Sequence, residues 1–426
     1  MTDTEPRPRR KSRSLFRFLG PGLVAGAADD DPSGIATYSQ AGAQFGYGLL
    51  WTVVLTWPFM VAVQLISARI GRVTGHGIAA NIKQSMPRPV LLGLVSLLLV
   101  ANTINIAADI AAMGEALQLV VGGGQHGHAL VFGLACVLLQ IYVPYKTYSS
   151  ILKWLTLVLF AYVATVFTVN VKWTEALAAT FWPTISFNKD YLLVVVAVFG
   201  TTISPYLFFW QASQEVEEME QSKRRPLRDL KRSGDQELDR IAIDTTIGMA
   251  FSSIIAFFII LTTAVTLHAH GIKDIQTSAQ AAEALRPLAG NLTFALFAMG
   301  IIGTGLLAVP VLAGSAAYGI AEAFGWKASL AAKPQEARGF YGIIAVATLI
   351  GVLIDFTPID PIKLLFWSAV INGAIAVPMI VAMMLLVSRQ SVMKRFTVPP
   401  LLKIAGWAAA VIMTAVIAAL CWSIFQ

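Results

Sequence analysis

The sequence has few charged residues and few cysteines. Charged residues make up 13% of its 426 residues and hydrophobic residues 56%, whereas a soluble domain carries roughly 25% charged residues. A surface of this composition cannot face water throughout, which excludes a soluble globular protein. The two cysteines, Cys136 and Cys421, lack the spacing of a metal-binding motif. Both fall in apolar stretches, where we expect them to act as packing residues.

Charge is missing from stretches long enough to cross a bilayer. A hydrocarbon core of about 30 Å takes about 20 helical residues, and its backbone groups must bond within the segment, which favours helices. The sequence therefore predicts an all-α integral membrane protein, with a transporter domain over 19–426 after a basic cytoplasmic tail at 1–18, and with a cytoplasmic loop at 215–240. We expect eleven transmembrane helices at 19–45 (interrupted), 49–69, 89–121, 128–143, 151–170, 191–213, 241–267, 291–323, 339–355, 362–387 and 401–425.

The net charge of +7 is distributed unevenly along the chain. With the N-terminus placed in the cytoplasm, 26 of the 31 Lys and Arg fall in the tail and in loops on that side. Cytoplasmic loops carry this excess in membrane proteins. The basic balance therefore indicates orientation in a cell membrane, with the C-terminus outside, and not binding to nucleic acid.

Two of the predicted spans are interrupted near their middle. The first is broken by Asp29-Asp30-Asp31-Pro32-Ser33-Gly34, and the sixth by Thr201-Thr202-Ile203-Ser204-Pro205. They are the first members of two five-helix sets, 1–5 and 6–10. Paired interruptions at corresponding positions indicate a transporter's binding site, which is formed by unwound backbone and half-helix ends.

Three consecutive aspartates at membrane depth need a partner. Each costs about 2.5–3.5 kcal/mol at the centre of a span, and such groups mark ion pathways by default. The sequence puts no Lys or Arg deep in a span, so a bound cation is the natural partner of Asp31. Asp29 or Asp30 could instead cap the second half-helix, whose N-terminus favours anions.

The candidate ligands around the two interruptions are oxygen atoms. Breaking the helices frees the carbonyls of Ala28 and Thr201, and Ser204 adds a hydroxyl. Carboxylate, carbonyl, hydroxyl and water suit Mg²⁺, Mn²⁺ or Ca²⁺ better than Cu or Zn. Asn372 on the tenth span is a further candidate, with packing as its alternative.

Polar residues also line one face of the third span. Asn102, Asn105 and Asp109 recur at spacings of three and four, which places them on one side of a helix. They predict either a second shell or ion path near the site, or hydrogen bonds between helices. The pattern leaves both interpretations open.

These motifs resemble those of the Nramp divalent-metal transporter family. The resemblance runs from about residue 19 to 390 and implies an amino-acid-transporter-like fold, in which two inverted five-helix repeats carry broken helices 1 and 6. It rests on Gly20-Pro21-Gly22, Asp31-Pro32, Gln64 to Arg69 followed by Thr74-Gly75, Asp109, Gly303-Thr304-Gly305 and Ala313-Gly314.

The chain departs from the family pattern at its ligand positions. The family's Asp-Pro-Gly-Asn ends here in Gly34, and its Met-Pro-His begins here with Ser204 and continues to Tyr206. The resemblance therefore implies that the Asn and the Met thioether of the transition-metal site are missing, as is the His linked to proton handling. A glutamate of the third span is also replaced, by Ala112, although Glu115 follows one turn later.

This pattern is similar to the Nramp-related magnesium transporter branch, whose looser site takes a partly hydrated Mg²⁺. We therefore expect a secondary transporter of divalent cations, Mg²⁺ first and Mn²⁺ second, with weak or absent proton coupling and no resident cofactor. One alternative is proton-coupled Mn²⁺ or Fe²⁺ uptake, with Glu115 replacing the missing proton carriers. Another is a sodium-coupled amino-acid or amine symporter, although three aspartates would repel a substrate carboxylate. No enzyme is expected, and the oligomeric state is left open.

Overall fold

A computed structural model describes residues 20–144, 147, 152, 154–230 and 234–424, so the predicted tail at 1–18 lies outside the described residues. Within these ranges the chain is helical and contains no strand. The longer helices and those near the site are α1 (Pro21–Asp29), α2 (Pro32–Phe45), α3 (Leu50–Thr74), α4 (Ile78–Ser85), α5 (Arg88–Val121), α6 (Gln125–Tyr142), α10 (Lys189–Thr202), α11 (Pro205–Gln221), α12 (Asp235–Thr266), α15 (Thr293–Phe324), α16 (Arg338–Asp355), α17 (Pro361–Val387) and α19 (Pro400–Ile424). Short helices connect them: α8 (Phe160–Val166), α9 (Trp173–Phe181), α13 (Ser278–Ala282), α14 (Arg286–Ala289) and α18 (Gln390–Met393).

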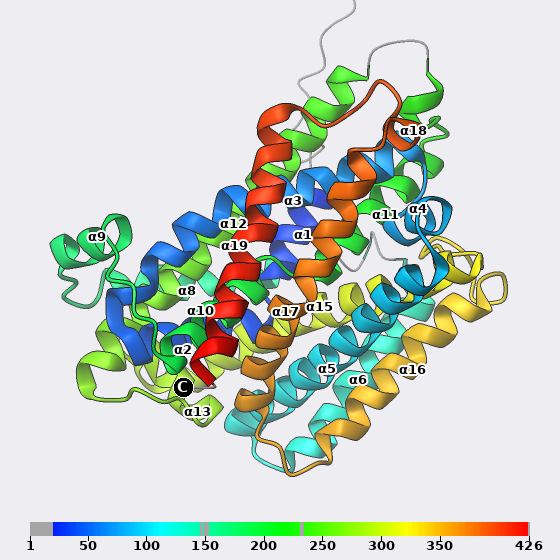
Figure 1. Cartoon of the computed structure of the whole chain (residues 1–426). Coiled ribbons are helices and arrows are strands. Elements are labelled where there is room, and N and C mark those ends of the chain that lie inside the picture. Colours follow the sequence, from blue (N-terminus) through cyan, green and yellow to red (C-terminus); the bar gives the residue numbers. More distant parts are fainter. Residues whose placement is uncertain (1–19, 145–146, 148–151, 153, 231–233, 425–426) are drawn as a thin grey trace, which may run out of the picture.

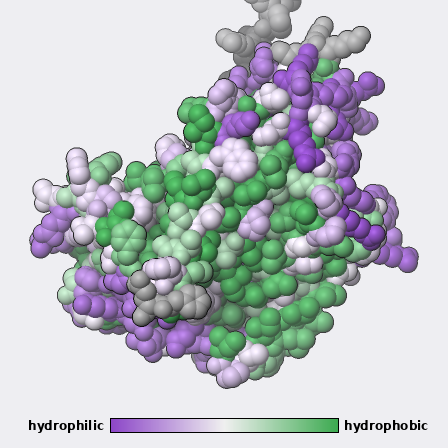
Figure 2. All heavy atoms as spheres, viewed as in Figure 1, coloured by the Kyte–Doolittle hydropathy of each residue, from purple (hydrophilic) through white to green (hydrophobic). Residues whose placement is uncertain are grey.

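The helices form an apolar body with polar ends. Within the described residues, eight helical segments are long and apolar enough to cross a membrane. Figure 2 shows hydrophobic side chains over the middle of the visible face and hydrophilic ones toward both ends. An all-helical integral membrane protein is therefore confirmed. The count of eleven spans stays a prediction, because one segment, Pro32–Thr74, contains parts of two predicted spans and 151–170 is described only in part.

Helices α1 and α2 lie along α12 because glycines allow close contact. A Cβ atom at Gly26 would lie 2.2 Å from the carbonyl oxygen of Gly248, and one at Gly42 would lie 2.2 Å from that of Ile260. No side chain fits at these distances, so glycine is required at both points. Small residues permit this approach between membrane helices. The packing fixes the two halves of the first predicted span against one helix.

The end of α3 and two polar loops meet at one end of the molecule. Arg69 donates to the carbonyl oxygen of Phe396 at 3.0 Å, and Lys394 pairs with Asp229 at 3.3 Å. Figure 1 shows α4 and α18 at this end and α9 and α13 at the other. Loops that the sequence predicts on the cytoplasmic side thus share one end. Which side of the membrane this end faces stays a prediction.

Candidate metal-binding site

The two gaps in the helices lie against each other inside the protein. Helix α1 ends at Asp29 and α2 begins at Pro32, while α10 ends at Thr202 and α11 begins at Pro205. Both prolines are the first helical residue, where the missing N–H is harmless. The hydroxyl of Tyr38 on α2 lies 3.0 Å from Thr202 Oγ1 at the end of α10, and the hydroxyl of Tyr206 on α11 lies 2.9 Å from the carbonyl oxygen of Ala28 on α1, so the two broken helices contact each other.

Asp31 is buried at the start of α2, with 1% of its surface exposed. Its Oδ1 accepts hydrogen bonds from the hydroxyl of Ser33 at 2.6 Å and the N–H of Gly34 at 2.7 Å. Its Oδ2 accepts from Nδ2 of Asn105 at 3.0 Å and from the hydroxyl of Tyr206 at 3.3 Å. Helices α2, α5 and α11 therefore all contribute to holding this carboxylate.

Asp31 itself caps helix α2, because the residue before a first-position proline is the N-cap residue. The alternative in which Asp29 or Asp30 caps this helix is wrong. Within the described chain, no Lys, Arg or His forms an ion pair with Asp31. A buried carboxylate without a paired charge is unfavourable. A cation bound beside Asp31 would therefore be attracted by an uncompensated negative charge.

Asp29 and Asp30 turn toward a different helix. Both are fully buried, and the hydroxyl of Ser252 on α12 lies 2.5 Å from Asp29 Oδ2 and 3.0 Å from Asp30 Oδ1. The second oxygen of each carboxylate has no hydrogen-bond partner. The three consecutive aspartates therefore do not converge. Sequence reasoning missed Ser252, and nothing in its local pattern signals this contact.

The predicted carbonyl and hydroxyl ligands already have partners within the protein. Tyr206 donates its hydroxyl to the carbonyl oxygen of Ala28 at 2.9 Å. Ser204 Oγ lies 2.7 Å from the carbonyl oxygen of Thr201 and 2.8 Å from that of Gly200. All these atoms lie at the ends of α1 and α10, beside the two gaps. The oxygens of Ala28, Thr201 and Ser204 are thus each hydrogen-bonded within the protein, Ala28 across to α11 and the other two within their own gap.

Gly34 lies where the two gaps approach each other. A Cβ atom at this position would lie 3.3 Å from the carbonyl oxygen of Asp29 and 3.3 Å from Thr201 Oγ1. These distances are tight for a side chain. Because Gly34 has no side chain, the carbonyl oxygen of Asp29 and Thr201 Oγ1 can both lie close to the start of α2.

Two buried amides have no partner for either polar atom. Asn372 on α17 is 1% exposed, and neither its oxygen nor its nitrogen makes a hydrogen bond; the same holds for Gln64 on α3. An unsatisfied buried amide loses its hydration without compensation. Asn372 thus stays a candidate ligand, and Gln64 is a polar group that the ligand prediction did not include.

The polar face of α5 serves more than one role. Asn102 donates to the carbonyl oxygen of Leu312 on α15 at 2.9 Å, which is a hydrogen bond between helices. Asn105 reaches Asp31. Asp109 is fully buried, and neither of its carboxylate oxygens has a hydrogen-bond partner. Hydrogen bonding between helices is therefore confirmed for Asn102 and Asn105, while a role of this face as a second shell or ion path stays a prediction.

Glu115 lies away from the Asp31 carboxylate. It accepts from the N–H of Ser278 at 3.2 Å and from its hydroxyl at 2.7 Å, which attaches α13 to α5. Ten residues separate it from Asn105, or about 15 Å along the helix. The structure therefore gives Glu115 a partner in α13, and does not bring it to the gap between α1 and α2.

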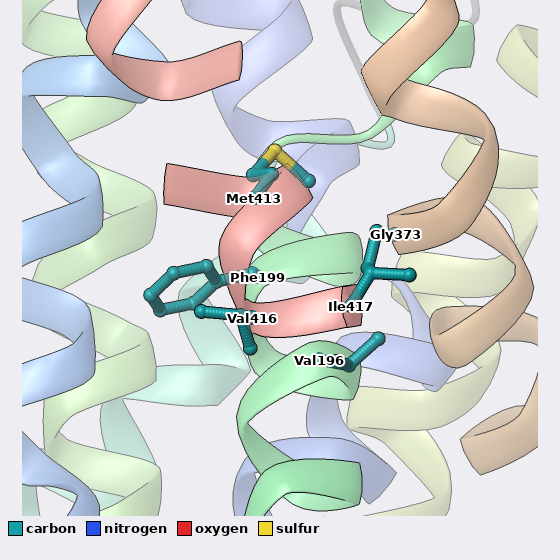
Figure 3. Close-up of a pocket in the computed structure, with 6 residues that line it drawn as sticks. All are labelled: Val196, Phe199, Gly373, Met413, Val416 and Ile417. Carbon is teal, nitrogen blue, oxygen red and sulfur yellow. The ribbon is translucent and has the colours of Figure 1, made fainter. Parts of the chain in front are cut away.

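No other feature of the described chain offers a better metal site. No group of three His, Cys, Asp or Glu side chains converges there. A cleft between α10, α17 and α19 has only apolar walls (Figure 3), which supply no ligand for a cation. Its lining consists of Val196, Phe199, Gly373, Met413, Val416 and Ile417.

Comparison with solved structures supports the fold. A manganese transporter from Eremococcus coleocola superposes with a TM-score of 0.77 and 16% identity, covering 97% of this chain and 87% of that one. Mhp1, a nucleobase-cation-symport-1 family transporter, superposes with a TM-score of 0.52 and 15% identity, covering 95% of this chain and 92% of that one.

Comparison with known sequences identifies the family. A Verminephrobacter eiseniae protein named divalent metal cation transporter MntH is 27% identical over 312 residues, which cover 70% of this chain and 66% of that protein. A Yersinia enterocolitica protein of the same name is 28% identical over 317 residues, or 72% of each chain. The family model described as natural resistance-associated macrophage protein-like matches residues 22–423. This chain therefore belongs to the Nramp family.

Proposed function

We propose that the protein transports divalent metal cations across a membrane, and that the cation binds at Asp31 between the two helix gaps. The observation that carries this proposal is a fully buried carboxylate without a cationic side chain in contact. The relatives named divalent metal cation transporter support the same substrate class. A transporter is favoured over an enzyme on the same grounds.

Mg²⁺ is the proposed preferred cation, with Mn²⁺ second. The proposed ligands are oxygens of Asp31, Ala28, Thr201, Ser204 and Asn372. Hard oxygen ligands suit Mg²⁺, which also keeps several waters because its dehydration is unfavourable. Position 204 offers a hydroxyl where the resemblance implies a thioether, and thioether sulfur selects softer metals.

Proton coupling is proposed to be weak or absent. Tyr206 stands where the resemblance implies a histidine. A histidine exchanges its proton near neutral pH, whereas an ordinary phenol has a pKa of about 10 and keeps its proton there. Glu115, the proposed replacement carrier in the alternative reading, is bonded to Ser278 instead.

The proposed arrangement in the membrane follows the charge distribution. We place the N-terminus and the segment at 215–240, which contains the end of α11 and the start of α12, in the cytoplasm. The C-terminus is then outside, in a cell membrane. Two inverted five-helix repeats would then begin with the helices broken near Asp31 and Ser204. The matching position of one gap at the start of each proposed repeat supports this symmetry.

Proton-coupled Mn²⁺ or Fe²⁺ uptake is the second candidate. It is favoured by the fold shared with a manganese transporter. A sodium-coupled symporter of amino acids or amines is the candidate from another class, and the weaker likeness to Mhp1 is compatible with it. The buried carboxylates of Asp29, Asp30 and Asp31 disfavour an anionic substrate group at this place.

Liposomes containing the purified protein test the proposal. Uptake of Mg²⁺, Mn²⁺ and Ca²⁺ is followed together with internal pH. We expect Mg²⁺ and Mn²⁺ influx without matching acidification, and loss of both fluxes in Asp31→Asn. The control is Asp355→Asn, which changes a buried carboxylate at the end of α16 that is bonded to His126 and not to a residue of either gap. Mn²⁺ influx with acidification and no Mg²⁺ influx would favour the second candidate.

A further inference from the structure

Protein donors surround the carboxylate of Asp31. An ionised carboxylate offers about four lone-pair positions, and Asp31 accepts hydrogen bonds from Ser33, Gly34 and Asn105 at three of them. The Tyr206 hydroxyl lies at the fourth, at 3.3 Å, and shares its single proton with the nearer carbonyl oxygen of Ala28. A cation that binds this carboxylate directly must therefore displace at least one of these groups, and they differ in how easily they leave.

The donors at the two oxygens differ in how they are held. Those at Oδ1, Ser33 and Gly34, belong to the first turn of α2, and the Gly34 N–H is part of the helix cap. Losing them would undo the start of the helix. Those at Oδ2, Asn105 and Tyr206, come from α5 and α11 and end in side-chain groups that can rotate. A cation therefore has access to Asp31 through Oδ2.

The hydroxyl of Tyr206 bridges two atoms that a cation would use. It lies 2.9 Å from the carbonyl oxygen of Ala28 and 3.3 Å from Asp31 Oδ2. A phenol has one proton, and this proton occupies lone-pair space between the two oxygens. A cation bound by Ala28 and Asp31 needs the same space. The hydroxyl and the cation thus compete directly.

Asn105 presents a donor on one side and a free acceptor on the other. Its Nδ2 donates to Asp31 Oδ2, while its Oδ1 is buried and has no hydrogen-bond partner. A half-turn of the amide exchanges oxygen and nitrogen in nearly the same volume. An anionic carboxylate alone favours the NH₂ group, and a cation beside it favours the oxygen, which is the harder ligand.

We propose that Asn105 and Tyr206 are exchangeable occupants of the cation position. Their donors hold Asp31 Oδ2 and the Ala28 carbonyl; when a divalent cation binds, the Tyr206 hydroxyl leaves, and Asn105 turns to ligate the cation through Oδ1. Asn105 thereby becomes a direct ligand and Tyr206 a competitor that lowers affinity. This inference rests on the proposed function and specifies how its site accepts the ion.

Tyr206→Phe tests the competitor role, because it removes the hydroxyl and keeps the ring. We expect the purified variant to bind Mg²⁺ and Mn²⁺ about tenfold more tightly by titration calorimetry, the change that follows from losing one competing hydrogen bond of about 1.4 kcal/mol. Equal or weaker binding would mean that the hydroxyl is a ligand or a positioning group, and would overturn its role as a competitor.

Asn105→Asp tests the ligand role, because an ionised aspartate offers oxygen and no donor. We expect the added thermal stabilisation by Mg²⁺, measured against EDTA, to exceed that of the wild type. Asn102→Asp is the matched control, because it adds the same charge one turn away on α5, at a residue bonded to Leu312 and not to Asp31. If Asn105 only positions Asp31 by donation, Asn105→Asp should be stabilised by Mg²⁺ no more than this control, and that result would overturn the ligand role.

The proposed function and the roles of Asn105 and Tyr206 are tested by different variants. Loss of binding in Asp31→Asn tests the proposed function and does not depend on Asn105 or Tyr206. If the wild type binds neither cation, the proposed function is wrong and the inference falls with it. If the wild type binds the cations and Asp31→Asn does not, the proposed function is supported. Whether cation binding then strengthens or weakens in Tyr206→Phe and Asn105→Asp tests the inference by itself.

Discussion

The hydroxyl of Ser204 lies 2.7 Å from the carbonyl oxygen of Thr201. Two residues of the proposed ligand set are therefore in contact with each other, across the turn that separates α10 from α11. The side chain at position 204 therefore sets which ligand atom this position offers. It also sets whether the carbonyl oxygen of Thr201 accepts a hydrogen bond from it. This makes position 204 the most direct point at which to alter cation preference.

Replacing Ser204 by methionine should change the selectivity of transport. The substitution removes the hydrogen bond to Thr201 and adds a soft thioether, which suits transition metals better than Mg²⁺. We expect Mg²⁺ uptake to fall more than Mn²⁺ uptake, by about tenfold in relative affinity, which corresponds to about 1.4 kcal/mol. Competition between the two ions in liposomes measures the ratio. An equal fall of both would mean only a blocked path.

Adding Gly34→Asn to Ser204→Met should deepen this shift, because it supplies the amide that the resemblance implies. The new Cβ atom meets the carbonyl oxygen of Asp29 and Thr201 Oγ1, both at 3.3 Å, so α2 must move by a few tenths of an ångström. Gly34→Ala is the control for this steric effect. The amide accounts for the shift only if the alanine double variant lacks it.

Two substitutions at Asp31 should separate its charge from its role as a helix cap. Asp31→Asn keeps an oxygen that can accept from Gly34, whereas Asp31→Ala removes the cap. We expect both to abolish uptake, and only the alanine variant to lose stability, by about 1 kcal/mol. Thermal unfolding in detergent with EDTA compares them. Uptake retained by the asparagine variant would contradict the role of the charge in binding.

Asp244 should stabilise the start of α1. Its carboxylate accepts from the N–H of Gly20 at 3.0 Å and from that of Gly22 at 2.8 Å, so a residue on α12 caps a helix far away in sequence. We expect Asp244→Ala to lower stability by about 1 kcal/mol, as loss of a helix cap does. Asp239→Ala, an exposed position on the same helix, serves as the control in the same unfolding measurement. Equal midpoints for the two variants would contradict the prediction.

The orientation in the membrane can be tested by thiol labelling. Ser222 is exposed after α11, and Gln276 is exposed near α13 at the other end of the molecule. A cysteine at Ser222 should react with an impermeant reagent only from the cytoplasmic side, and one at Gln276 only from outside. Cys421 is exposed and is first replaced by serine, while Cys136 is buried. The opposite pattern would invert the proposed topology.

The class of the protein and the positions of both gaps follow from the amino-acid sequence without the structure. A chain with 13% charged residues must hide most of its surface from water. Pro32 and Pro205 each begin a helix, whereas Pro58, Pro310 and Pro378 lie inside helices. The small polar residues before Pro32 and Pro205, together with the missing N–H of proline, therefore indicate the two gaps. The sequence also pointed to Asp31 as the charged residue at the first gap, but its role as the cap of α2 was assigned to Asp29 or Asp30 and was corrected by the structure. These inferences needed only chemistry that acts between near neighbours in the chain.

The partners of the buried polar groups follow from the tertiary structure and not from the sequence. Asp31 meets Asn105 across 74 positions and Tyr206 across 175, while Asp29 meets Ser252 across 223. Glu115 equally finds Ser278 across 163 positions, and not the gap beside Asp31. Such contacts depend on which helix faces pack together, and here glycines at Gly26 and Gly42 set that packing against α12. No local pattern contains this information, because it arises when distant segments exclude lipid and water from the same space.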